Sequence, residues 1–72
     1  MKDIDGREVV IRAERGYHGF GTRPYSITIE TRRGVKGFRA TWLPTNNSAR
    51  FAGKREATAF VKAHERIAYG TG

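Results

Sequence analysis

The lysine and arginine residues of this sequence are its best candidates for a functional site, and side chains of this kind bind anions. The chain has 14 Lys and Arg residues against 7 Asp and Glu, a formal net charge of +7. Residues 15–55 hold nine of these basic residues and a single acid, Glu30. A block of cations between nearly neutral ends favours a surface that faces a polyanion. An acidic protein surface would attract the same charges. If the excess of basic residues only aids solubility, no binding partner is implied.

Side chains suited to catalysis or metal binding are few and scattered. His18 and His64 are far apart in the sequence, Cys is absent, and no acidic pattern completes a metal site with either histidine. No serine has an evident base beside it, and Glu14 with Glu30 would be a weak signal for a metal nuclease. We therefore expect a protein that is not an enzyme and has no cofactor, with His64 packed in the core.

Two predicted strands, 25–32 and 38–43, and the turn between them carry four of the nine basic residues of this block. Both alternate with period 2, and the first is rich in β-branched residues, so the pair should form a hairpin with one apolar face and one polar face. The turn between them carries Arg32, Arg33 and Lys36. These charges repel one another unless an external anion is present. A phosphate clamp and an ordinary solvated turn both fit this pattern.

The rest of the chain predicts a third strand at 7–14 and a helix at 54–69, with a polar loop at 44–52 between the hairpin and the helix. Gly53 suits the helix N-cap. One helical stripe is apolar and should cover the apolar face of the sheet. Its residues are Ala57, Phe60, Val61, His64, Ile67 and Ala68, opposite Val9, Ile11, Ile27, Ile29, Phe38 and Trp42. The predicted fold is a single α+β domain over 1–72, a three-stranded antiparallel sheet packed on one C-terminal helix (β-β-β-α).

Residues 15–24 form a predicted loop with three glycines. Their spacing, G-x-x-G-x-G before a strand, fits neither nucleotide-binding loop, since both precede a helix. Tyr17 and Phe20 lie among basic residues, so with Tyr25 they could stack on the unpaired bases of an RNA. No apolar run is long enough to span a bilayer. We expect no membrane contact and a cytoplasmic location.

The segments YSITIETRRGVKGFRATWL and RFAGKREATAFVKAHERI together carry a resemblance to a known family. A strand-turn-strand followed by an amphipathic helix with a basic head resembles the arm-type DNA-binding domain of phage and transposon tyrosine recombinases. The likeness covers roughly residues 7–68. Arm domains normally precede a core-binding and a catalytic domain, which these 72 residues do not contain. The chain is either an excised domain or a stand-alone protein.

The resemblance implies that the outer face of the sheet enters the major groove of DNA, which admits a β-ribbon. Arg39 is then the candidate for a bidentate contact to guanine. Glu30 shares this face and counts against it, unless it pairs with Arg39 or reads a cytosine amine. The remaining cations would hold phosphates and fix position. The predicted nucleic-acid-binding residues are Arg12, Arg23, Thr28, Arg32, Arg33, Lys36, Arg39, Thr41, Lys54 and Arg55.

The sequence leaves two classes of function open. The first is a double-stranded DNA-binding module related to phages or mobile elements, with DNA a better partner than RNA. The alternative is a small phage-encoded protein-interaction module or inhibitor that docks on an acidic host protein or nucleoprotein surface.

Overall fold

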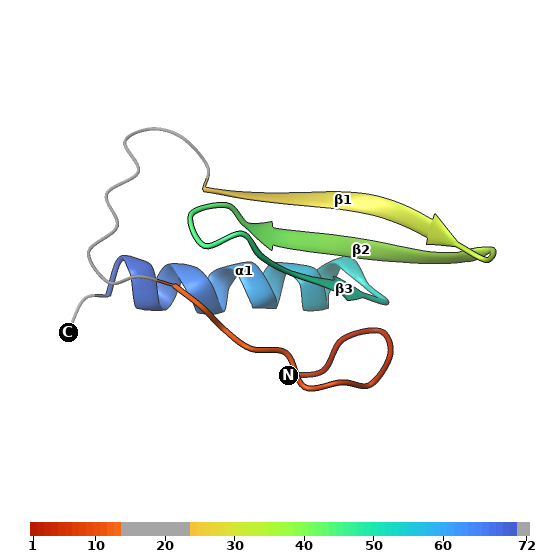
Figure 1. Ribbon diagram of the computed structural model, residues 1–72, viewed down its shortest axis with the longest axis horizontal. Helices are drawn as coiled ribbons and strands as arrows, with labels where there is room; N and C mark the ends of the chain where they lie inside the picture. The colour runs from red at the N-terminus through yellow and green to blue at the C-terminus, as the bar shows by residue number, and fades with distance from the viewer. Residues whose placement is uncertain (14–23, 71–72) are drawn as a thin grey trace.

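The structure is a computed structural model that describes residues 1–13 and 24–70. These residues form three strands and then one helix: β1 (Tyr25–Arg32), β2 (Val35–Trp42), β3 (Asn47–Phe51) and α1 (Lys54–Ala68). The strands make an antiparallel sheet in the order β1-β2-β3, and α1 runs along one face of it (Figure 1). The predicted α+β fold, a three-stranded antiparallel sheet with one C-terminal helix, is confirmed.

A two-residue turn sets the register of the β1–β2 hairpin. Arg32 pairs with Val35, which leaves Arg33 and Gly34 as the turn, with φ angles of 51° and 77°. Two positive φ angles in succession are typical of a type I′ turn, whose twist matches that of the strands. The strand predicted at 25–32 is confirmed. The second strand begins at Val35 and ends at Trp42, so the basic turn is shorter than predicted.

The third strand lies at residues 47–51, inside the segment predicted to be a loop. Asn47, Ala49 and Phe51 pair with Trp42, Ala40 and Phe38 of β2. The cluster of turn-forming residues before Ala49 obscured this alternation, because asparagine and serine also favour turns. The turn itself ends earlier, at Asn46, whose φ of 58° is positive.

The strand predicted at 7–14 is absent from its described part, residues 7–13, which lies outside the sheet. A single antiparallel bridge joins Lys2 to Glu8, and the Ile4 N–H donates to the Arg50 carbonyl at the edge of β3 over 2.8 Å. Val9 and Ile11 still pack against the core. Their β-branched, alternating pattern reflects burial, which a segment lying against the core achieves without a ladder of hydrogen bonds.

The core lies between α1 and the inner face of the sheet. Trp42 and Phe51 from the sheet and Phe60 and Val61 from the helix are fully buried. The helix begins after Gly53, the predicted N-cap, and ends at Ala68, one residue before the predicted end. Of the predicted apolar stripe only Ile67 is exposed. No helix in the described part of the chain is long and apolar enough to cross a membrane.

The predicted role of His64 as a packed, hydrogen-bonded core residue is confirmed. Its Nδ1 lies 2.8 Å from the Phe60 carbonyl, which can only accept, so we assign the ring proton to Nδ1. Nε2 then accepts from the Asn47 side-chain amide at 3.0 Å and from the Arg12 backbone N–H at 3.3 Å. This network holds the N-terminal segment against β3 and α1.

The β1–β2 hairpin extends past the N-terminal end of α1 (Figure 1). Ile29, predicted to lie under the helix, is therefore 61% exposed, and Val35 on the opposite face is also exposed. Lys36 reaches over the Phe38 ring, with Nζ 5.5 Å from the centroid, and partly covers the projecting apolar surface.

Candidate nucleic-acid interface

The outer face of the sheet, opposite α1, is polar and basic. Because paired residues of antiparallel strands share a face, the register places one row of Thr28, Arg39 and Arg50 across all three strands. A second row contains Ser26, Thr41 and Ser48. Arg32 extends the face toward the turn. Glu30 is the only acid that β1, β2 and β3 contain.

Glu30 and Arg39 form an ion pair in the middle of this face. Arg39 Nε lies 2.6 Å from Glu30 Oε2, and its Nη1 donates to Ser48 Oγ over 3.1 Å. Arg32 Nε is 3.7 Å from the other carboxylate oxygen. The hydrogen bond from Arg39 holds the pKa of Glu30 below its usual value, and the charges of Arg39, Arg32 and Arg50 act in the same direction against desolvation. The carboxylate therefore stays ionised and fixes the Arg39 guanidinium.

The side chain of Arg50 extends from β3 across the neighbouring strand β2. Its Nη2 donates to the Val35 carbonyl over 2.8 Å, and its guanidinium covers Gly37, where a Cβ would come within 2.6 Å of Arg50 Nε. Only a glycine leaves room for this crossing. The sequence predicts a loop at 44–52, so Arg50 is not among the predicted site residues, although the apolar residues on either side of Arg50 alternate as in a strand.

Acidic residues of the N-terminal segment flank the β3 side of the face. Asp3 and Glu8 line one groove together with Arg39 and Arg50, and Asp5 lines a second. Glu8 is already paired with the N-terminal amine at 3.2 Å. Asp5 shares its groove with Arg32 and Arg33 at the hairpin turn, so an anionic ligand would approach the outer face from the β1 side.

The predicted binding residues separate into two groups. Thr28, Arg32, Arg39 and Thr41 lie on the outer face, with Arg33 at the turn. Arg12 lines the groove beside Arg39 and Arg50.

The other predicted residues lie elsewhere. Lys54 and Arg55 lie on the other side of the sheet, at the start of α1, and Lys36 faces that same side. Arg23 lies outside the described residues, as do His18, Tyr17 and Phe20.

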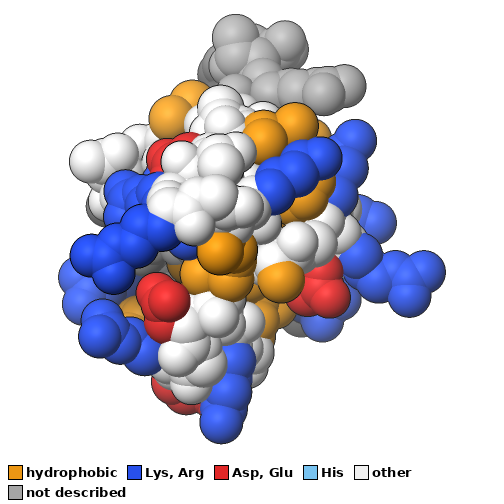
Figure 2. All heavy atoms as spheres, turned by 90° about the vertical axis from the view of Figure 1, so that its right-hand side faces the viewer, with side chains coloured by type: hydrophobic (Ala, Val, Ile, Leu, Met, Phe, Trp, Pro, Cys, Tyr) orange, Lys and Arg blue, Asp and Glu red, His pale blue; other side chains and the backbone are white. Residues whose placement is uncertain are grey.

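Basic and apolar side chains alternate around the projecting end of the hairpin. Figure 2 looks onto this end and shows Lys and Arg on both flanks, with hydrophobic side chains exposed between them. A rigid polyanion can contact one flank at a time, since the sheet separates the two groups. The described residues contain no cluster of three potential metal ligands. His64 has both ring nitrogens occupied within the core.

Comparison of the chain with protein-family models, curated proteins and solved structures finds no match.

Proposed function

We propose that this protein binds double-stranded DNA through the outer face of its sheet. The observation that carries the proposal is the row of Arg39 and Arg50 next to Arg32 on a face that α1 does not cover, where Glu30 is the only acid that the three strands contribute. The major groove is wide enough for a β-ribbon, and a guanidinium suits phosphate as a bidentate partner.

The ion pair assigns different roles to the arginines of this face. Arg33, exposed at the turn, and Arg32, which is exposed beside Glu30, would contact phosphates and fix the position of the protein on the duplex. Arg39 is held by Glu30 and Ser48, so a bidentate contact to guanine requires its guanidinium to leave the carboxylate. Glu30 thus competes with DNA for Arg39 and lowers affinity for any sequence that offers no better partner.

The role proposed for the molecule is that of a cytoplasmic DNA-binding module of a phage or mobile element. This role follows the resemblance to arm-type recombinase domains, and the three-stranded sheet with one C-terminal helix is compatible with it. Thr28 and Thr41 would lie against base edges on this arrangement, since both belong to the outer face.

Fluorescence anisotropy with a labelled duplex tests the proposal. If the outer face contacts about four phosphates, raising salt from 50 to 200 mM should weaken binding on the order of 100-fold through counterion release. Arg32→Ala and Arg50→Ala should each reduce the salt slope by about 1. Arg66→Ala, which removes a cation from the last turn of α1, is the matched control and should leave the slope unchanged.

Three results would overturn this proposal. No detectable binding at low salt would remove it outright. Equal losses from Arg66→Ala and Arg50→Ala would indicate diffuse attraction without a defined surface. Tighter binding to single-stranded RNA than to the duplex would indicate that RNA is the ligand instead of DNA. A stoichiometric protein captured from nuclease-treated lysate, together with no DNA binding, would instead support the protein-interaction alternative.

A further inference from the structure

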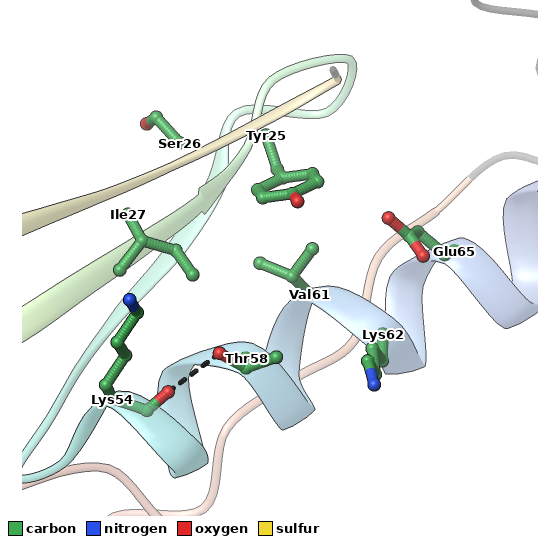
Figure 3. A pocket seen from close by; sticks show the side chains of 8 residues that line it. All are labelled: Tyr25, Ser26, Ile27, Lys54, Thr58, Val61, Lys62 and Glu65. Atoms are coloured by element: carbon green, nitrogen blue, oxygen red, sulfur yellow. Dashed lines mark hydrogen bonds between the residues drawn. The ribbon is translucent and has the colours of Figure 1, made fainter.

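A second surface lies on the other side of the sheet, between the edge of β1 and α1. It is a groove of about 540 Å³ with an apolar floor formed by Tyr25, Ile27 and Val61. Lys54, Thr58 and Lys62 line it along the helix, and Glu65 closes the end beside Tyr25 (Figure 3).

The β1 side of this groove is a strand edge with which no other described residue pairs. Arg32 and Val35 close a two-residue hairpin, and Pro24 accepts from the Leu43 N–H over 2.8 Å, so the even-numbered residues of β1 bond to β2. The backbone N–H and C=O groups of Tyr25, Ile27, Ile29 and Thr31 must then point away from the sheet. No described backbone group outside β2 bonds to β1. An unpaired edge of this kind is a template for a further strand.

The same odd-numbered residues turn their side chains toward the helix layer. Ile27 lines the floor of the groove, and Ile29 is exposed beyond the end of α1. A peptide that pairs with this edge would therefore gain backbone hydrogen bonds and an apolar contact with Ile27 and Val61 together. The edge of β1 and the apolar floor of the groove therefore belong to one binding site.

Two lysines and one acid, Glu65 at the end beside Tyr25, line the groove, so its charge favours an acidic peptide. Lys54 points its ammonium group toward Ile27, and Lys62 lines the groove from α1 with its ammonium group turned away from Ile27 in this view (Figure 3). Neither ammonium lies within ion-pair distance of any carboxylate in residues 1–13 and 24–70. The two lysines are eight positions apart on a helix, about 12 Å. Four residues of a strand span about 13.6 Å, so acids at positions i and i+4 of an added strand match the spacing of the two lysines along α1.

We propose that the groove binds an extended acidic peptide segment of a partner protein, which pairs with β1 as a fourth strand. Its side chains facing α1 are two acids four residues apart with an aliphatic residue between them. A second copy of this chain is the wrong occupant, because the net charge of +7 opposes pairing of two β1 edges that carry Arg32 and face Lys54. The site is separate from the outer face proposed for DNA.

Solution NMR with the peptide Thr-Glu-Thr-Val-Thr-Glu-Thr as the probe tests this proposal. Binding should slow hydrogen exchange at the Ile27 and Ile29 amides, which point outward in the free protein, and leave Thr28 unchanged because it already bonds to β2. A peptide with lysine in place of both glutamates should bind at least tenfold more weakly. Protection of amides elsewhere, or equal binding of the two peptides, would overturn the proposal.

Matched variants separate the groove from the DNA surface. The double variant Lys54→Glu with Lys62→Glu should weaken the acidic peptide at least tenfold, whereas Arg66→Glu makes a charge change of the same kind on α1 outside the groove and should not. Ile29→Pro removes an outward N–H without a ladder bond, so the fold should persist while affinity falls. Arg50→Ala should leave peptide affinity unchanged. A dimer of the free protein in sedimentation analysis would instead assign the edge to a second copy and refute an acidic partner.

Discussion

Arg39 Nε and Glu30 Oε2 lie 2.6 Å apart at the centre of the outer face of the sheet. Both side chains are under one third exposed, and Ser48 holds the other end of the guanidinium. The face proposed to bind an anion thus carries an internal anion of its own. The affinity of this face for an anion should therefore depend on Glu30 as well as on its arginines.

Glu30→Gln should therefore strengthen DNA binding. The substitution releases Arg39 and adds one unit of positive charge to the face, which predicts a severalfold gain in affinity at low salt and a steeper salt dependence. Anisotropy titrations at two salt concentrations measure both quantities. Glu65→Gln, which removes an acid on α1, is the control and should have a smaller effect. Weaker binding by Glu30→Gln would mean that Glu30 itself contacts the ligand.

Acid should destabilise the wild-type protein through Glu30. Folding lowers the pKa of this carboxyl from 4.5, chiefly through the Arg39 hydrogen bond. The ion pair therefore stabilises the fold above pH 4.5, and that contribution is lost as the pH falls through the lower pKa of the folded state. Urea unfolding at several values between pH 3 and 6 should show a smaller loss of stability for Glu30→Gln than for wild type. An identical pH dependence in both proteins would contradict this linkage.

Gly37 and Arg50 should be energetically coupled. Gly37→Ala places a Cβ against the Arg50 side chain and should displace its bond to the Val35 carbonyl, lowering stability by about 1 kcal/mol. With Arg50→Ala already present, the same alanine no longer meets the Arg50 side chain and should stabilise β2 by roughly 0.5–1 kcal/mol, as expected for removal of a glycine from a strand. Urea denaturation of the four proteins of this double-mutant cycle measures the coupling. Additive effects would show that Arg50 does not cross β2 in solution.

Asn47→Asp should detach the N-terminal segment. The Asn47 amide donates to the Val10 carbonyl and to His64 Nε2, whereas an aspartate would present only acceptors to two acceptors. We expect a loss of about 1–3 kcal/mol in the free energy of unfolding. Hydrogen exchange should rise at the Arg12 amide, which bonds to His64, while β1 and β2 keep their protection. Uniform loss of protection across the sheet would show that the segment and the sheet unfold together.

The fold class could be predicted because the strongest patterns belong to the elements that make the core. The alternation of β1 and the helical stripe around Phe60 each identify a single structure. The third strand was misplaced because two segments compete for it. Val9–Val10–Ile11 resembles a strand yet lies outside the sheet, while the true strand at 47–51 begins with turn-forming residues. Single-sequence patterns report burial and local propensity, and neither tells which segment reaches the edge of β2.

The candidate site was harder to predict, because it depends on how the strands pair. The sequence identifies Arg32, Arg39 and Glu30 as neighbours in the hairpin, and the possibility of an Arg39–Glu30 pair could be stated. The contribution of Arg50 required the register of β3, which aligns it with Arg39. The separation of Lys54 and Arg55 from the outer face required the position of α1 beneath the sheet.

The hydrogen bond from Arg12 to His64 spans 52 residues, whereas each strand and the helix lie beside elements next to them in the chain. Closing short loops costs less conformational entropy than closing a long one, so neighbouring elements meet early during folding. The hairpin, β3 and α1 should therefore assemble first, and the amino-terminal segment should dock last. The final step of the folding pathway is thus the one that places Asp3 and Glu8 beside the arginines of the sheet.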